Sequence, residues 1–195
     1  VQPDLPVEAM VWMPKQRYRI MRQYLGARGR HAHKMMTQTA SVQVSVDYSD
    51  EADWREKFRA GFLLAPLAGA VFSNSRRYEG RDSGYSSFRS HIWRHTDDDR
   101  CGAPAFVFRE DFTLDDWTRY LVDMPMMFVR GPEGLEAAGG LPFSRFMAEG
   151  WKGRCATMDD WTLHVTGVFT EARTKTYIEL RSADLMPDDE ILGVP

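Results

Sequence analysis

The sequence has little of what several classes of protein depend on. Its 195 residues include two cysteines, Cys101 and Cys155, which are too few for the disulfide framework of a small secreted domain. The longest apolar stretch, 61–72, is interrupted by Pro66 and falls short of the ~18 residues typical of a membrane-spanning helix. The formal net charge is −3, so the strong basic excess of a nucleic-acid-binding domain is missing. We therefore expect no membrane partner and no nucleic-acid partner.

Motifs that would identify a catalytic class are also missing. No glycine-rich phosphate loop of the Walker or Rossmann type occurs, so nucleotide binding would need another architecture. His31 with His33, and His91 with His95, have spacings that metal ligands use, but the paired cysteines or His-Glu-x-x-His of zinc sites are absent. The start of the chain lacks the basic and apolar regions of a secretory signal. With two free thiols, we expect a cytoplasmic protein.

The overall composition is that of a folded domain. Hydrophobic residues make up 43% of the chain, close to the usual share in globular proteins. The length suits a single domain over residues 1–195. Helical and strand patterns are mixed, and we expect the α+β class, with an antiparallel sheet backed by helices.

Helix signals are clear at several places. Apolar residues at helical spacing predict a helix over 17–25 and another that begins after Ser49 or Asp50 and ends before 73–75. Thr113 and Thr157 are each followed by Asp at the third position, which predicts two further helix starts, with ends near 122 and 169. The remaining expectations are a loop over 27–34, strands over 105–108 and 126–129, and a short helix over 142–149.

Two segments alternate with a period of two residues, which predicts strands. They are 39–48, in which Val42, Val44 and Val46 alternate with Ser41, Gln43 and Ser45, and 175–181, in which Thr176, Ile178 and Leu180 alternate with Tyr177, Glu179 and Arg181. A polar sheet face of this kind is either solvated or the floor of a site. We expect the two strands to share an antiparallel sheet, with Gln43 and Glu179 on one face.

Seven segments, taken in order, resemble the glutamate–cysteine ligases of the plant and proteobacterial type. They are Met13-Pro14-Lys15-x-Arg17-Tyr18-x-Ile20-Met21-Arg22; Met35-Met36-x-x-Thr39-Ala40-Ser41-Val42-Gln43-Val44; Ser49-x-Glu51-Ala52-Asp53 with Lys57-Phe58-Arg59-Ala60-Gly61; Phe72-x-Asn74-Ser75-x-x-x-Glu79-Gly80; Tyr85-x-Ser87-x-Arg89-Ser90-His91-Ile92-Trp93; Asp123-Met124-Pro125-Met126; and Tyr177-Ile178-Glu179-Leu180-Arg181-Ser182-Ala183-Asp184. Each segment alone is weak, but their common order is specific.

This resemblance implies an ATP-dependent carboxylate–amine ligase with a glutamine-synthetase-like antiparallel sheet, incomplete relative to the family. In that family, ATP phosphorylates the γ-carboxylate of glutamate, and the amine of cysteine then attacks the acyl phosphate, which is the first step of glutathione synthesis. The implied small-molecule partners are glutamate, cysteine and ATP, and the implied metal is Mg²⁺. Phosphoryl transfer of this kind depends on positioning and charge neutralisation more than on a protein nucleophile.

The resemblance also assigns roles to individual residues. Glu179 is expected to bind Mg²⁺, and Gln43 occupies a strand position that faces the metal, because Mg²⁺ takes oxygen ligands. Arg181 and Arg89 are expected to hold a substrate carboxylate or the transferring phosphate, a task suited to the bidentate guanidinium group.

Other features of the resemblance concern the substrate pocket and its limits. Met36 and Thr39 are expected along the glutamate and cysteine pocket. The family's principal acidic metal ligands lie upstream of Met13, so the chain resembles an internal fragment that we expect to be inactive alone. Ala40 stands where plant relatives have cysteine. Arg173 falls between predicted elements, and we expect it in a polar turn where mutation has little effect.

Two rival functions remain open at this point. A related γ-glutamyl ligase that uses another amine would share the same segments. A non-catalytic binding domain that kept the ligase scaffold after losing its metal site would also share them. An upstream glutamate-rich strand in a longer gene would favour an enzyme.

Overall fold

Helices form most of the regular structure of the chain, of which a computed structural model describes residues 4–188 and 190–194. The α-helices are α1 (Gln16–Gly26), α2 (Ala32–Gln38), α3 (Glu51–Val71), α4 (Phe88–Trp93), α5 (Leu114–Asp123), α6 (Phe143–Glu149) and α7 (Met158–Val165), and the 3₁₀-helices are η1 (Val7–Ala9), η2 (Ala105–Phe108) and η3 (Ile191–Gly193). Within the described ranges, no helix combines the length and apolar content needed to cross a membrane.

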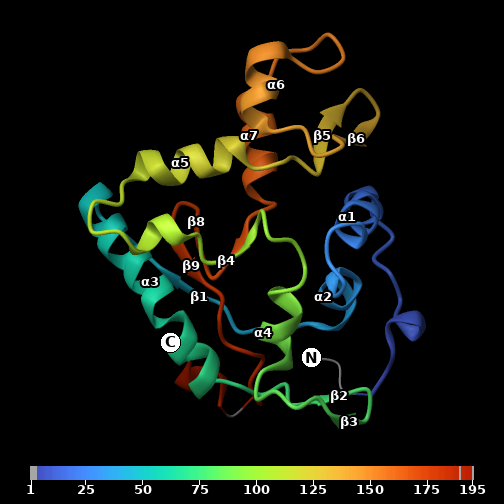
Figure 1. Cartoon of the computed structure of the whole chain (residues 1–195), viewed down its shortest axis with the longest axis vertical. Helices are drawn as coiled ribbons and strands as arrows, with labels where there is room; N and C mark the ends of the chain where they lie inside the picture. The colour runs from blue at the N-terminus through green and yellow to red at the C-terminus, as the bar shows by residue number, and fades with distance from the viewer. Residues whose placement is uncertain (1–3, 189, 195) are drawn as a thin grey trace.

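The strands are short and mostly antiparallel. They are β1 (Val44–Val46), β2 (Arg77–Tyr78), β3 (Arg81–Asp82), β4 (Cys101–Gly102), β5 (Phe128–Gly131), β6 (Gly134–Ala137), β7 (Phe169–Thr170), β8 (Ala172–Thr174) and β9 (Ile178–Leu180). A three-stranded antiparallel sheet has the order β1-β9-β8, and β4 pairs with β7 in parallel (Figure 1). The expected α+β class with an antiparallel sheet is therefore confirmed.

The register of the sheet decides which side chains share a face. Ser45 on β1 lies opposite Glu179 on β9, and Glu179 lies opposite Arg173 on β8. The two period-two segments therefore pair as expected, although the strands are shorter than predicted. Val44 and Leu180 lie opposite each other on the other face.

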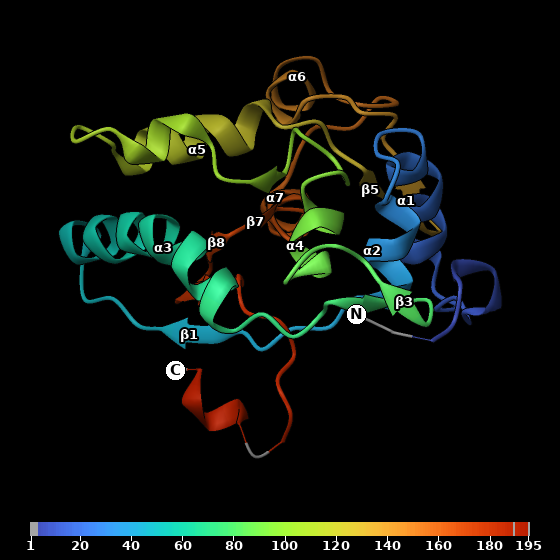
Figure 2. The ribbon, with the colours of Figure 1, turned by 60° about the horizontal axis from the view of Figure 1, so that its bottom comes forward.

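Helix α3 covers the apolar face of this sheet and lies between β1 and α5 (Figure 2). It begins at the predicted cap, where the Asp50 carboxylate accepts a hydrogen bond from the Asp53 N–H at 2.9 Å. Gly61 lets the sheet approach, because a Cβ there would lie 2.6 Å from the Cδ2 atom of Leu180. The indole N–H of Trp54, also on α3, donates a hydrogen bond to Oγ1 of Thr174, the last residue of β8, at 2.9 Å.

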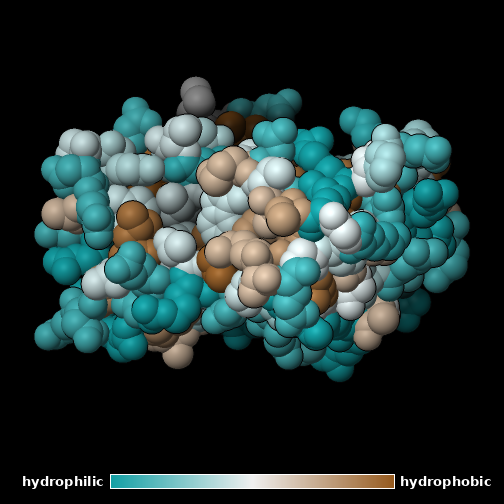
Figure 3. Space-filling model, turned by 90° about the horizontal axis from the view of Figure 1, so that it is seen from above, coloured by the Kyte–Doolittle hydropathy of each residue, from teal (hydrophilic) through white to brown (hydrophobic). Residues whose placement is uncertain are grey.

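The largest apolar cluster lies between α3 and the sheet, and two further apolar clusters complete the packing. One joins α1, α2 and α4, and the other lies beneath α6 around Phe143 and Phe146. Seen from above, over α5, α6 and α7, the surface is mainly hydrophilic, with apolar side chains gathered near its middle (Figure 3).

A buried arginine joins segments that are far apart in the sequence. Arg100 is fully buried, and its Nε donates to Asp97 Oδ2 at 2.6 Å. Its other nitrogens donate to the carbonyl of Pro125 at 2.8 Å, the hydroxyl of Tyr24 at 3.1 Å and the carbonyl of Gly167 at 3.2 Å. A buried charge must be paired and hydrogen-bonded to be tolerated. Arg100 therefore fixes the chain ahead of β5 and β7.

Three local expectations were wrong. The segment 27–34 is not all loop, because α2 begins at Ala32, whose side chain is buried. The apolar run at 105–108 is the 3₁₀-helix η2, since a run this short fits a buried turn as well as a strand. Helix α7 ends at Val165 rather than near 169, and Gly167 follows at a position where a Cβ atom would lie 2.9 Å from the Cε atom of Met127. Both threonines predicted as caps, Thr113 and Thr157, do form capping boxes.

The core around α3 makes a first testable prediction. Phe58 is fully buried, with ring centroids 4.7 Å from Trp117 and 4.9 Å from Trp54. Phe58→Ala should lower the free energy of unfolding by ~3–5 kcal/mol, because it loses apolar burial and leaves a cavity. Leu67→Ala, on the same helix at 60% exposure, should change it by at most ~0.5 kcal/mol. Urea unfolding of both variants measures this, and equal losses would contradict the core assignment.

Candidate functional site

A single carboxylate binds three cations on the polar face of the sheet. Glu179 Oε2 accepts hydrogen bonds from Arg173 Nη2 at 2.6 Å and from Arg181 Nη1 at 2.7 Å. Its Oε1 accepts from Lys175 Nζ at 2.5 Å. The Glu179 side chain is only 6% exposed. We call Glu179 with Arg173, Lys175 and Arg181 the Glu179 cluster.

The sequence builds this cluster through the short β8–β9 hairpin. Arg173 lies directly across the ladder from Glu179, and Arg181 follows Glu179 by two residues on the same face. Lys175 lies in the turn, whose backbone closes with a hydrogen bond from its N–H to the Tyr177 carbonyl at 2.7 Å. Opposite charges across a ladder stabilise a sheet.

The surrounding charges keep Glu179 ionised. Burial alone raises the pKa of its carboxyl group. Hydrogen bonds from Lys175 and Arg181, together with the charges of Arg173 and Arg181, outweigh burial and lower that pKa to about 2. The cluster therefore has one negative and three positive side chains at neutral pH.

A fourth cation, Arg17 on α1, lies beside Arg173. Both guanidinium groups reach the carbonyl of Thr166 after the end of α7, Arg17 at 3.4 Å and Arg173 at 3.5 Å, and Arg173 also donates to the Val168 carbonyl at 3.1 Å. Carbonyls at a helix C-terminus lack helical partners and favour cations. Burial lowers the pKa of Arg17, and the charge of Arg173 lowers it further against the opposing effect of Tyr18. Positive charge is in excess here, which suits an anionic ligand.

Arg89 supports this site from behind. It lies on α4, is 4% exposed, and donates to the main-chain carbonyls of Arg181 at 2.8 Å and Ser182 at 3.4 Å. The Trp93 ring lies 5.8 Å from the Arg89 guanidinium and 5.7 Å from that of Arg181. Structure thus brings Arg89 and Arg181 together, with Arg89 holding the backbone from which Arg181 projects.

Asp184 ties the same backbone to α3 and α4. Its carboxylate is buried and accepts hydrogen bonds from Ser75 Oγ at 2.6 Å, the Asn74 N–H at 2.8 Å and Ser87 Oγ at 3.0 Å. Ser87 is also the N-cap of α4. The segment after β9 therefore has a fixed path past Arg89.

Two hollows lie along the segment that contains Arg181 and Ser182. A small one is lined by Arg89, Trp93 and Arg181 among others, and a groove of about 500 Å³ runs between α3 and α4. Both are lined in part by Ser90 and Glu171. The groove reaches Ser182, the residue after Arg181, and Arg181 itself lines the small hollow.

The other predicted site residues are less closely joined. Gln43 is exposed, and its amide Nε2 donates to Ser41 Oγ at 3.5 Å, while the ladder with β9 stops at Val44. Met36 is partly buried against the α1–α2–α4 cluster, and Thr39 Oγ1 donates to the Met35 carbonyl at 2.7 Å. Their roles in substrate binding stay predictions.

The residues of this chain do not fit a Mg²⁺ ion by themselves. Mg²⁺ prefers several oxygen ligands, but the described part of the chain has no group of three or more His, Cys, Asp or Glu side chains arranged to hold a metal. Both oxygens of Glu179 are already bonded to cations. The roles of Glu179 and Gln43 toward Mg²⁺ are left as predictions for the complete protein.

Three histidines do come together, but as packed rings. His31, His91 and His95 have ring centroids 4.3–5.7 Å apart, next to Phe88 and Tyr85. Burial, followed by the charge of nearby basic residues, lowers the pKa of His31 to about 4. The close, tilted packing of these rings supports a structural role.

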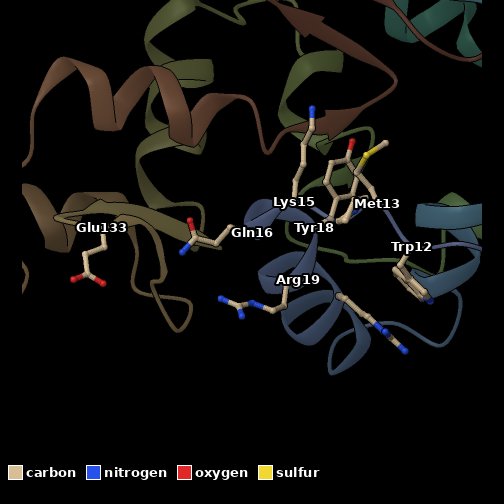
Figure 4. A pocket seen from close by; sticks show the side chains of 9 residues that line it. Trp12, Met13, Lys15, Gln16, Tyr18, Arg19 and Glu133 are labelled. Atoms are coloured by element: carbon tan, nitrogen blue, oxygen red, sulfur yellow. The ribbon is translucent and has the colours of Figure 1, made fainter.

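A surface hollow of about 550 Å³ near α1 does not form a convergent site. Its lining residues are Trp12, Met13, Pro14, Lys15, Gln16, Tyr18, Arg19, Arg22 and Glu133. Lys15 and Tyr18 point to one side, Arg19 points to the other, and Glu133 lies apart from them (Figure 4). Their charged groups therefore do not meet around one ligand.

The expectation for Arg173 was wrong. It is not in a polar turn but on β8, with a side chain 13% exposed and an ion pair to Glu179. A usable signal existed in the sequence, because Glu171, Arg173 and Lys175 alternate with Ala172 and Thr174. A three-residue strand was too short for that alternation to be given weight.

Comparison with known proteins decides the family. A family model described as Glutamate-cysteine ligase family 2 (GCS2) matches residues 3–195. The chain belongs to this family. It is 42% identical to a protein named "Glutamate--cysteine ligase, chloroplastic" from Nicotiana tabacum, over 98% of this chain and 36% of that protein. It is 41% identical to the protein of that name from Brassica juncea, over 100% of this chain and 38% of that protein.

This GCS2 chain spans little more than a third of the length of those relatives. The names also correct one expectation: a cytoplasmic location is contradicted, because each of these relatives is named as chloroplastic. Cysteine content could not have shown this, since two free thiols fit any reducing compartment.

The Glu179 cluster makes a second prediction. Glu179→Gln should lower the free energy of unfolding by ~3–5 kcal/mol, because it leaves buried cations without their counter-charge. Glu136→Gln, which breaks an exposed pair with Lys152, should cost ~0–1 kcal/mol. Since the folded-state pKa of Glu179 is lowered, its stabilisation is present above pH ~4.5 and is lost as the pH falls toward 2. Thermal unfolding of both variants at neutral pH measures the difference. Equal losses of stability in the two variants would show that the buried ion pairs of Glu179 contribute no more than an exposed one.

Proposed function

We propose that the complete protein is an ATP-dependent glutamate–cysteine ligase. Membership of the GCS2 family supports this. The observation that carries the proposal is the Glu179 cluster, in which Arg181, Arg173 and Lys175 converge on one buried carboxylate and leave positive charge in excess. Glutamate, cysteine and ATP are the proposed substrates.

The proposed chemistry needs positive charge more than a nucleophile. An oxygen of the glutamate γ-carboxylate attacks the γ-phosphorus of ATP, the bond to ADP breaks, and an acyl phosphate forms. The amine of cysteine, having lost a proton, then attacks the carbonyl carbon and expels phosphate. Both steps develop or move negative charge, which preorganised guanidinium groups stabilise.

Within this proposal, Arg181 contacts the transferring phosphate or a substrate carboxylate. Its guanidinium is held by Glu179, and its backbone is held by Arg89. Arg89 contributes by this support and by its charge next to Trp93. Met36 and Thr39 are proposed to line the substrate pocket, and Glu179 and Gln43 are proposed to face Mg²⁺ in the complete protein, with no step assigned to the metal.

The full-length protein should be assayed with ATP, Mg²⁺, glutamate and a panel of amines. We expect equimolar ADP and γ-glutamylcysteine, identified by mass spectrometry. A γ-glutamyl product with another amine in preference to cysteine would support the related ligase instead. Binding of glutamate and ATP without any product would support a non-catalytic domain.

Arg181 gives the third prediction. In the full-length enzyme, Arg181→Ala should lower kcat/KM by about 10²–10³-fold, because a charged donor to developing negative charge is removed. Arg145→Ala, which breaks an exposed pair with Glu149 on α6, should leave the rate nearly unchanged. Steady-state kinetics decides: near wild-type turnover with an unchanged glutamate KM in Arg181→Ala would contradict the assigned role.

A further inference from the structure

Arg173 shares one carboxylate oxygen with Arg181. Glu179 Oε2 accepts from Arg173 Nη2 at 2.6 Å and from Arg181 Nη1 at 2.7 Å. The Arg173 side chain is 13% exposed and that of Arg181 is 9% exposed. The orientation of the Arg181 guanidinium therefore depends on the orientation of the Glu179 carboxylate, which Arg173 helps to fix.

The other side of the Arg173 guanidinium is fixed to the main chain. Its Nη1 donates to the Val168 carbonyl at 3.1 Å and is 3.5 Å from that of Thr166. A guanidinium is planar and its donors keep a fixed geometry, so both ends are oriented together. Arg173 thus connects the chain after α7 to the Glu179 carboxylate.

We propose that Arg173 is a positioning residue for the ligase reaction, which orients Glu179 and through it the Arg181 guanidinium. This inference rests on the proposed function. Without Arg173, Oε2 would bind Arg181 alone, and the carboxylate could rotate about its last torsion as far as Lys175 on Oε1, whose side chain is 38% exposed, allows. Arg181 would follow that rotation, although Arg89 would still hold its backbone.

The expected kinetic consequence follows from geometry. A catalytic group displaced by about 1 Å can lose up to about a hundredfold in rate. The loss should fall on kcat more than on KM, because positioning matters most where charge develops in the transition state. A residue that only stabilised the fold would lower the melting temperature and leave kcat unchanged.

The full-length enzyme with Arg173→Met, Arg173→Lys and Arg154→Met tests the proposal. Arg154 is the matched control, because it pairs at 2.7 Å with Asp160, whose side chain is 1% exposed, at the start of α7. We expect Arg173→Met to lower kcat by about 10–100-fold with glutamate KM within about threefold. Arg173→Lys keeps the charge and should recover part of the loss, and Arg154→Met should keep kcat within about twofold.

A second readout separates this inference from the proposed function. In ¹⁵N-labelled protein, the Arg181 Nε–H signal, assigned with Arg181→Lys, should shift or broaden in both Arg173 variants and stay unchanged in Arg154→Met. An unchanged Arg181 signal, or wild-type kcat in Arg173→Met, would overturn the positioning role. Absence of any ligase product from the wild-type enzyme would overturn the proposed function, and the Arg181 signal would still decide the positioning of its guanidinium. If Arg173→Met fails to fold, Arg173→Lys decides by the same two measurements.

Discussion

The ion pairs of Glu179 are the constraint on which the site depends. A carboxylate that is only 6% exposed must be compensated, and here three cations do so: Arg173 on β8, Lys175 in the turn between β8 and β9, and Arg181 directly after β9. This is possible only in one register of β8 against β9, since a shift by one residue would turn Glu179 toward α3. The electrostatics of one face and the packing of the other therefore require the same strand pairing.

The rest of the fold holds that register in place. Gly61 allows α3 to pack against Leu180, and Trp54 bonds to Thr174 on β8. Arg100 donates a hydrogen bond to the carbonyl of Gly167, just after α7. The next carbonyl along the chain, that of Val168, accepts a hydrogen bond from Arg173. These contacts come from distant parts of the chain, so a mutation that removes any of them should also disturb the geometry of the Glu179 cluster.

Patterns within single elements were readable from the sequence. The alternation around Val44 and around Glu179 predicted two paired strands, and the threonine caps at 113 and 157 predicted two helix starts. Resemblance to the ligases selected Arg181 and Glu179. The contact of Glu179 with Arg173 and Lys175 could not be predicted, because it depends on a three-residue strand and a turn whose pairing only the tertiary structure fixes.

The pKa of Glu179 tests the central claim most directly. The carboxyl carbon can be followed by ¹³C NMR as the pH is lowered, with Glu179→Gln used for assignment. The cluster predicts a pKa of about 2, because hydrogen bonds and charge from its cations outweigh burial. A pKa close to the usual glutamate value of ~4.3 would show that the cations do not converge on this carboxylate, and would contradict the account of the site.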